Sequence, residues 1–386
     1  MPETPCFPRS LPWFANPAAR TWTCPPAPTG VEDFHASLAD YTPTPLTELP
    51  TLAAELGVGR VFVKDESFRL GLPAFKALGA SWAIHQVLSR RRATTHPDGP
   101  VTFVTATDGN HGRAVARMAR LLGQRAHIFV PQGVHPVAAA AISAEEAEVT
   151  QVAGPYDEAV RQAADAAAGP GSGAAAGLRS SVLVQDTAWS GYEQIPGWIV
   201  EGYSTLFTEI DAQLNAAGAR SPSLVAVPVG VGSLAQAAVT HYRSRSAESG
   251  TALLAVEPDA AACVLTSLTR QEPLSVATGE TTMAGLNCGT PSSIAWPFLR
   301  DGLDAAVAVN DADSARAARD LAALGVSSGP CGAASLAGIR AALTADGAGA
   351  GAESRRTALA LEPTSTLVLL STEGTAANPH LHESAQ

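Results

Sequence analysis

The sequence predicts an α/β protein of two domains, each with a mostly parallel sheet flanked by helices. Three observations favour this fold. Short apolar, β-branched runs alternate with Ala-rich segments over roughly 300 residues, which is the pattern of strand–helix repeats. The 386 residues are 46% hydrophobic and only 16% charged, so the chain can bury a large core. Aromatic residues make up 5%, which suits helices packed tightly on a sheet better than an aromatic-rich β-sandwich.

Three segments are expected to be irregular. Residues 1–50 hold eleven of the 28 prolines, which predicts an extended arm lying on the body, and residues 1–40 are taken as that arm. The stretches 166–177 and 345–353 are rich in Ala and Gly and predict surface loops. No internal repeat of fixed period is found.

Eight apolar runs each predict a strand that helices cover on both faces. They are residues 61–63, 101–104, 127–130, 182–184, 224–229, 253–256, 305–309 and 366–370. A helix is expected after Gly112, because Val115, Met118, Ala119 and Leu122 recur at the spacing of one helix face.

Charge and cysteine usage exclude several function classes. Lys and Arg total 25 against 36 Asp and Glu, a net charge of −11, so nucleic acid and acidic membrane surfaces are not expected partners. No apolar stretch reaches the roughly 20 residues of a membrane span, and no signal peptide is seen at the N-terminus. The five cysteines are far apart and lack a C-x-x-C pair, which argues against a disulfide scaffold or a metal site and for the cytoplasm.

Ligands of α/β folds bind past the carboxyl ends of strands, so strand-to-helix turns are the candidate sites. The turn 230–235, Gly-Val-Gly-Ser-Leu-Ala, offers free N–H groups at a helix start and predicts phosphate binding. It also fits the G-x-G-x-x-A dinucleotide pattern, with Glu257 as the ribose ligand. The 27 residues from Gly230 to Glu257 make that spacing long, and a plain tight turn is the third interpretation.

Three further turns could carry chemistry. Residues 105–112, Thr-Ala-Thr-Asp-Gly-Asn-His-Gly, can aim several polar groups at one point, or can simply cap a helix. Lys76 lies between apolar residues at an expected helix start, where burial would favour a neutral amine that forms Schiff bases; the alternative is a surface lysine. Residues 371–374, Ser-Thr-Glu-Gly, place a hydroxyl at a strand end where it could meet a ring nitrogen.

Together, in this order, the turns resemble those of the fold-type II pyridoxal-phosphate enzymes, the threonine dehydratase and tryptophan synthase β group. The closer resemblance is to the diaminopropionate ammonia-lyases, and it runs from about residue 35 to residue 375. The motifs that carry it are Tyr-Thr-Pro-Thr-Pro-Leu at 41–46, Lys-Asp-Glu-Ser at 64–67, Ala-Phe-Lys-Ala-Leu-Gly at 74–79, the turn 105–113, Gln-Asp-Thr-Ala-Trp at 185–189 and Met-Ala-Gly-Leu at 283–286.

The resemblance implies roles for particular residues. Lys76 would hold pyridoxal 5′-phosphate as a Schiff base, Asn110 would bind the ring hydroxyl, and Asp108 and Asp186 would form the acid–base pair. Thr372, with Ser371 as second choice, would face the pyridine nitrogen. The amides that would hold the phosphate belong to Gly230, Val231, Gly232, Ser233 and Leu234. The same resemblance implies a large cofactor-binding domain of residues 41–81 and 196–386, a small mobile domain of residues 82–195, and a homodimer.

The implied reaction is the β-elimination of 2,3-diaminopropionate, a small amino acid, to pyruvate and ammonia. Two departures leave the substrate open: Pro330-Cys331 stands where the lyases usually have Glu-Ser, and Ser190 where they often have Glu. Elimination or β-replacement on another β-substituted alanine, in a biosynthetic pathway, is therefore an alternative. An NAD-dependent oxidoreductase and a catalytically silent binding protein are the alternatives of other classes.

Overall fold

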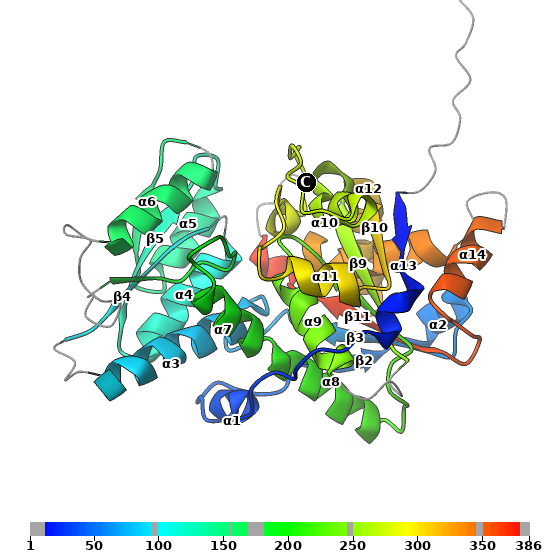
Figure 1. The fold of residues 1–386 in the computed structure, drawn as a ribbon. Helices are drawn as coiled ribbons and strands as arrows, with labels where there is room; N and C mark the ends of the chain where they lie inside the picture. The colour runs from blue at the N-terminus through cyan, green and yellow to red at the C-terminus, as the bar shows by residue number, and fades with distance from the viewer. Residues whose placement is uncertain are drawn as a thin grey trace, which may run out of the picture.

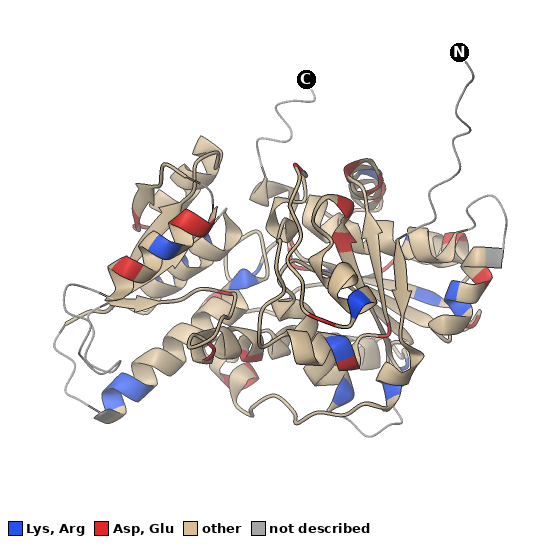
Figure 2. Cartoon of the chain, turned by 45° about the horizontal axis from the view of Figure 1, so that its top comes forward, with Lys and Arg blue, Asp and Glu red and all other residues tan. Residues whose placement is uncertain are grey.

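The computed structural model describes residues 12–94, 99–107, 109–154, 156–168, 181–244, 250–344 and 350–378. Within them the chain forms two sheets flanked by helices, a smaller half on the left of Figure 1 and a larger half on the right. Acidic and basic residues are interspersed over the described parts of both halves (Figure 2). The described part contains no helix long and apolar enough to cross a membrane.

The smaller half is a four-stranded parallel sheet in the order β6-β5-β4-β7. Its strands are β4 (Thr102–Ala106), β5 (Arg125–Val130), β6 (Glu148–Gln151) and β7 (Ser181–Leu183). The helices of this half are α3 (Lys76–Thr94), α4 (Asn110–Leu121), α5 (Pro136–Ser143) and α6 (Tyr156–Ala168). Because β4 and β7 are parallel neighbours, their carboxyl ends lie at the same edge of the sheet.

The larger half is a seven-stranded sheet in the order β1-β10-β9-β8-β11-β3-β2. Its five central strands run parallel, and the two edge strands are antiparallel to their neighbours. The strands are β1 (Trp13–Ala15), β2 (Leu46–Glu48), β3 (Arg60–Asp65), β8 (Leu224–Pro228), β9 (Ala252–Pro258), β10 (Ala305–Val309) and β11 (Thr366–Ser371).

Helices cover both faces of the larger sheet. Val225 and Val227 of β8 belong to the apolar core shared with the helices of residues 194–243, whereas Leu224 and Ala226 belong to the core shared with the helices of residues 311–343. This alternation explains why the strand reads as one continuous apolar run. The helices of this half are α1 (Val31–Ala36), α2 (Pro50–Leu56), α7 (Gln194–Gly202), α8 (Ser204–Ala216), α9 (Ser233–Arg243), α10 (Cys263–Arg270), α11 (Trp296–Gly302), α12 (Asp311–Ala323), α13 (Pro330–Leu343) and α14 (Ala350–Ala358), with 3₁₀ turns η1 (Pro17–Thr21), η3 (Asp259–Ala261), η4 (Ala284–Leu286) and η5 (Thr375–Ala377).

The predicted fold class is confirmed, and each of the eight expected strands is present. The helix predicted after Gly112 is α4, whose Val115, Met118 and Ala119 are buried as expected. The predicted domain boundaries stay predictions; α3 runs unbroken through the boundary placed between residues 81 and 82.

Three predictions about irregular segments need correction. The proline-rich arm contains regular elements, because Trp13–Ala15 forms the edge strand β1, which pairs with β10, and residues 31–36 form α1. Residues 350–353 begin α14 instead of ending a loop, and residues 345–349 lie outside the described residues. Residues 166–168 close α6, and the rest of the loop predicted to end at 177 also lies outside them.

Candidate active site

Lys76 and Asp186 form an ion pair where the two halves meet. Lys76 is the first residue of α3, as predicted, and Asp186 lies in the loop between β7 and α7. The Lys76 Nζ donates a hydrogen bond of 2.6 Å to Asp186 Oδ2, and the side chains are 20% and 13% exposed. Burial opposes both charges, but the neighbouring groups outweigh it: Asp186 holds the pKa of Lys76 above its ordinary value, and His111 and Lys76 together hold the pKa of Asp186 below its own. At neutral pH the pair is therefore an ammonium and a carboxylate.

Two buried groups beside this pair escaped the sequence analysis. His111 Nε2 donates to the carbonyl of Val184 at 2.8 Å, which leaves Nδ1 unprotonated in the neutral ring and 3.7 Å from Asp186 Oδ2. Burial lowers the pKa of His111, which favours this neutral form. Tyr203 packs against Phe75 with the two rings tilted and their centroids 4.8 Å apart, and its buried hydroxyl finds no hydrogen-bond partner among the described residues. Nothing in the sequence marks Tyr203, whereas His111 stands inside a motif already singled out.

Lys64, the other lysine of the chain, cannot take the role predicted for Lys76. Its Nζ donates to the carbonyl of Thr44 at 2.8 Å, to Glu209 Oε2 at 2.6 Å and to Gln213 Oε1 at 2.8 Å. An ammonium has three N–H donors, so all of them are engaged. The side chain is fully buried, and burial is the main cause of its lowered pKa. Lys64 therefore stabilises the interior of the larger half.

The turn from β8 to α9 has the form expected of a phosphate site. Gly232 precedes α9 with a φ of +101°, a conformation that side chains disfavour. A Cβ on Gly230 would lie 2.9 Å from Cys288 Sγ, so both glycines are needed. The amides of Gly230, Val231 and Gly232 find no acceptor among the described residues. Ser233 begins α9 and donates its hydroxyl to the carbonyl of Asp186 at 2.8 Å, which places this turn beside the ion pair.

The hydroxyl groups predicted at the end of β11 differ in their contacts. Ser371 is fully buried and donates to Ser328 Oγ at 2.8 Å, so its hydroxyl already serves the interior. Thr372 is 4% exposed, and its carbonyl accepts a 3.2 Å bond from the amide of Phe75, the residue before Lys76. The geometry therefore favours Thr372 over Ser371 as a group that can face a ligand near Lys76.

Asn110 is the first residue of α4 and reaches across to the larger half. Its Nδ2 donates a 2.7 Å bond to Glu373 Oε2, directly after Thr372 in the chain. Asp108 lies outside the described residues. Asp186 does not cap the helix that follows it, because the N-cap of α7 is Glu193.

Glu257 cannot serve as a ribose ligand. Its Oε1 accepts from the amide of Val264 at 2.8 Å and its Oε2 from the amide of Leu265 at 2.7 Å, so the carboxyl caps α10. The side chain is fully buried, and burial raises its pKa to about 8. The dinucleotide interpretation of the turn after β8 therefore lacks its acidic partner.

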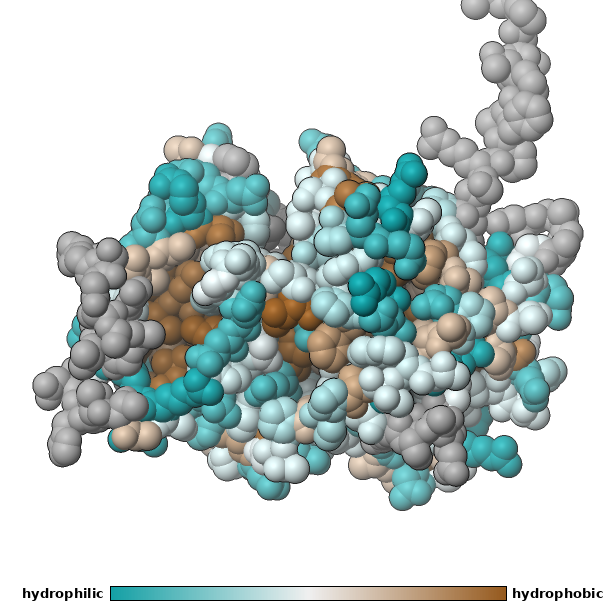
Figure 3. Space-filling model, in the orientation of Figure 1, coloured by the Kyte–Doolittle hydropathy of each residue, from teal (hydrophilic) through white to brown (hydrophobic). Residues whose placement is uncertain are grey.

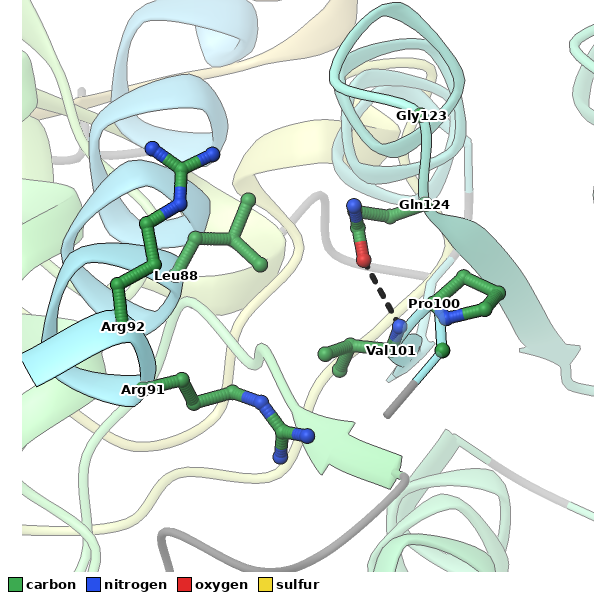
Figure 4. Close-up of a pocket in the computed structure, with 8 residues that line it drawn as sticks. Leu88, Arg91, Arg92, Pro100, Val101, Gly123 and Gln124 are labelled. Atoms are coloured by element: carbon green, nitrogen blue, oxygen red, sulfur yellow. Dashed lines mark hydrogen bonds between the residues drawn. The ribbon is translucent and has the colours of Figure 1, made fainter. Parts of the chain in front are cut away.

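A cavity of about 330 Å³ in the smaller half is remote from these residues. It is lined by the residues before β4 and β5, Val101 and Gln124, at the opposite edge of the sheet from the turns described above. Figure 4 shows the guanidinium groups of Arg91 and Arg92 pointing in different directions, so they do not converge on one ligand. Figure 3 shows instead a notch in the surface between the two halves.

Residues 38–355 match the family described as pyridoxal-phosphate dependent enzyme. The chain is 38% identical over 309 residues to the diaminopropionate ammonia-lyase of Salmonella typhimurium, which covers 75% of this chain and 74% of that protein. Crystal structures of the Escherichia coli diaminopropionate ammonia-lyase superpose over 96% of this chain and 95% of theirs. The complex with an aminoacrylate–PLP azomethine intermediate gives a TM-score of 0.84 at 33% identity, and the complex with D-serine gives 0.85 at 32%.

Proposed function

Because the chain belongs to the family of pyridoxal-phosphate-dependent enzymes, whose cofactor it uses, we propose that it catalyses the β-elimination of 2,3-diaminopropionate to pyruvate and ammonia. The observation that carries the proposal is the ion pair of Lys76 and Asp186 beside an open glycine turn. A lysine amine, a carboxylate base and a phosphate site are the groups that such an elimination needs. The 38% identity to diaminopropionate ammonia-lyase supports the substrate.

The residues of the site fit the cofactor. The amides of Gly230, Val231 and Gly232 have no acceptor among the described residues, and α9 adds the positive end of its dipole, so a phosphate group satisfies donors that the protein leaves open. Ser233 and Leu234 extend the same turn. When bound, pyridoxal phosphate supplies an electron sink for the negative charge that develops on the substrate.

Lys76 and Asp186 exchange a proton in the proposed reaction. An amine must be neutral to attack a carbonyl carbon, and Lys76 is charged at rest. Asp186 Oδ2 lies 2.6 Å from Nζ and can accept its proton, which leaves a nucleophilic amine and a neutral acid. Asp186 then delivers or removes protons on one side of the substrate. We assign the other side to Asp108, on the resemblance alone.

The remaining groups orient the cofactor ring. Asn110 would donate to the ring hydroxyl of the bound cofactor, and Thr372 would face its pyridine nitrogen. A neutral hydroxyl there leaves the nitrogen largely unprotonated, which favours elimination over transamination. Ser371, whose hydroxyl is bound to Ser328, is the weaker candidate.

Pyruvate formation from a panel of β-substituted alanines, in both enantiomers, tests the substrate. We expect 2,3-diaminopropionate to give the highest kcat/KM, with ammonia and pyruvate in a ratio of two to one because both nitrogens leave the carbon skeleton. A higher kcat/KM for another β-substituted alanine would overturn the choice of substrate. Failure to form a protein-bound visible band with pyridoxal phosphate would overturn the cofactor chemistry as well.

A second candidate is elimination or β-replacement on another β-substituted alanine. It is favoured by Pro330 and Cys331 at the start of α13, where the diaminopropionate ammonia-lyases that the sequence resembles usually have an acid, and by the exposed Ser190. In the panel, product formation that requires an added nucleophile would identify β-replacement.

The assembly and the location of the protein remain predictions. We expect a homodimer, from the resemblance, and a cytoplasmic enzyme. Light scattering at micromolar concentration should give twice the mass of the 39.4 kDa chain. A mass of one chain would contradict the dimer.

A further inference from the structure

Glu373 lies at the centre of the contacts around Asn110, although no role was predicted for it. It follows Thr372 after β11, it is only 3% exposed, and it accepts three hydrogen bonds. Oε2 accepts from Asn110 Nδ2 at 2.7 Å, while Oε1 accepts from the amide of Cys331 at 3.2 Å and from Asn378 Nδ2 at 2.9 Å. Two of these donors come from the larger half, and Asn110 comes from the smaller half.

The charge of Glu373 suits its surroundings. Burial raises its pKa, and the thiol of Cys331 together with the three N–H donors opposes that shift by stabilising the ionised form. Cys331 lies in the first turn of α13, where the helix dipole also favours a carboxylate.

The carboxylate determines which way the Asn110 carboxamide points. An ionised carboxylate only accepts hydrogen bonds, so the end of Asn110 that faces Glu373 has to be Nδ2. One N–H of Nδ2 is used in this bond, and the second stays available. The Asn110 side chain would otherwise be free to present its oxygen, which would repel a cofactor oxygen.

We propose that Glu373 is a positioning residue for the cofactor, which fixes the Asn110 carboxamide so that its second N–H donates to the ring hydroxyl of pyridoxal phosphate. This inference rests on the role proposed for Asn110, and it is independent of which amino acid is the substrate. The contact also ties the start of α4 to the end of β11, so the orientation of Asn110 depends on the two halves being in contact.

Glu373→Gln is the informative variant because it keeps the shape and removes one acceptor. The amide of Cys331 is a fixed donor, so the Gln oxygen is expected to face it and the Gln amide to face Asn110. Asn110 must then flip and present its oxygen to the Gln amide. We expect the dissociation constant of pyridoxal phosphate, measured by titrating the cofactor-free protein, to rise about tenfold. The pH at which the visible band of the bound cofactor titrates should shift as well.

Two further variants separate positioning from general structure. Asn378→Ala removes another donor to the same carboxylate without touching Asn110, and its cofactor affinity should stay within about twofold of the parent. Asn110→Ala should weaken cofactor binding at least as much as Glu373→Gln, and the double variant should be no weaker than Asn110→Ala alone. Additive losses in the double variant would overturn the inference, and so would a Glu373→Gln protein with unchanged affinity and spectrum.

The same variants of Glu373, Asn110 and Asn378 separate this inference from the proposals on which it rests. If Asn110→Ala leaves the spectrum and the affinity unchanged, the role proposed for Asn110 fails and the inference fails with it. If Asn110→Ala weakens binding and Glu373→Gln does not, only the inference fails. Should Glu373→Gln not fold, Glu373→Asp gives the same test, because it keeps the charge but is one methylene too short to reach Asn110.

Discussion

The ammonium of Lys76 has one carboxylate partner, Asp186, whereas the ammonium of Lys64 has three acceptors in the interior. This difference decides which lysine can act as a nucleophile, and the sequence could not show it. The sequence favoured Lys76 only through its apolar neighbours, Phe75 and Ala77, and its place at an expected helix start. The partner of Lys76 lies 110 positions away in the chain, so it depends on how β7 and α3 are brought together.

Replacing Lys76 with Ala should abolish the visible band of the bound cofactor and nearly all turnover. The reason is that no other amine lies free beside Asp186 among the described residues. Lys64→Met is the matched control: it should lower the free energy of unfolding, because Glu209 loses a buried cation, yet keep the band. Absorbance spectra and melting temperatures of the two variants check this. If the Lys76→Ala protein keeps the band at neutral pH, another residue holds the cofactor.

Asp186 and Asp108 should serve different enantiomers of the substrate. A planar reaction centre can be deprotonated from either side, and one base reaches only one side. Asp186→Asn should reduce the rate mainly on the L-substrate and Asp108→Asn mainly on the D-substrate, each by about 10²–10⁴-fold, the usual contribution of a general base. Kinetics on both enantiomers, with melting temperatures for both variants, test the assignment. Equal losses on both enantiomers together with lowered melting would show that the two residues are structural.

At the level of helices and strands, the buried parallel strands were the predictable part. Runs such as 224–229 are apolar on both faces, and the structure shows why, because helices cover each face. The strands that were missed lie at sheet edges. Residues 13–15 and 46–48 are three-residue strands beside prolines, and Glu148–Gln151 is mostly polar, with Val149 its one apolar residue. An edge strand needs only a partner backbone, which composition does not reveal.

The helix α14 shows the opposite failure. Its sequence, Ala-Gly-Ala-Glu-Ser-Arg-Arg-Thr-Ala, begins with the Ala and Gly that predicted a loop. The prediction gave too much weight to the glycines and too little to Ala, which has the highest helix propensity. Arg355 and Arg356 fix the helix by donating to the carbonyls of Ala342 and Leu56, contacts that only the folded chain brings together.

The cap that Glu257 of β9 provides to α10 should make stability depend on pH. Its pKa is raised from an ordinary value of 4.5 to about 8, chiefly by burial. Between these values the folded state keeps a proton on Glu257 that the unfolded state has released. The contribution of Glu257 to the free energy of unfolding is therefore full below pH 4.5 and is lost as the pH rises towards 8. In this range the free energy of unfolding should fall by at most about 1.4 kcal/mol per pH unit on account of Glu257.

Urea unfolding of the parent and of Glu257→Gln, from pH 5 to pH 8, measures this contribution. The variant cannot titrate at this position, and its amide leaves one α10 N–H without an acceptor, a loss that does not depend on pH. The advantage of the parent over the variant should therefore shrink as the pH rises. A difference that stays constant over this range would show that Glu257 keeps one protonation state in both forms.

At the level of the whole molecule, the site is assembled from both halves. Asn110 comes from the smaller sheet and the turn 230–234 from the larger one, while the loop with Asp186 is bound at Ser233. The sequence predicted these turns because each has its own signature of glycines and polar residues. It missed Tyr203 and Glu373 because their importance arises only from the neighbours that the two sheets bring to them.

Removing the cofactor should therefore destabilise the whole molecule. A ligand that binds only the folded state at 100 times its dissociation constant adds about 2.7 kcal/mol to the free energy of unfolding. Inorganic phosphate should restore part of that loss to the cofactor-free protein by occupying the turn before α9. Gly232→Ala should abolish the response to phosphate, because its φ of +101° strains any side chain and a Cβ would lie 2.6 Å from Leu299 Cδ1.

Gly218→Ala is the control for the strain itself. Its φ is also positive, at +64°, but a Cβ there meets nothing within 4 Å, and it lies just after α8 instead of in the turn before α9. Both variants should melt below the parent because both hold a side chain in a left-handed conformation. Only Gly218→Ala should still be stabilised by phosphate and by pyridoxal phosphate. If both variants respond equally to phosphate, the anion binds elsewhere, and the turn after β8 is a tight turn without a ligand.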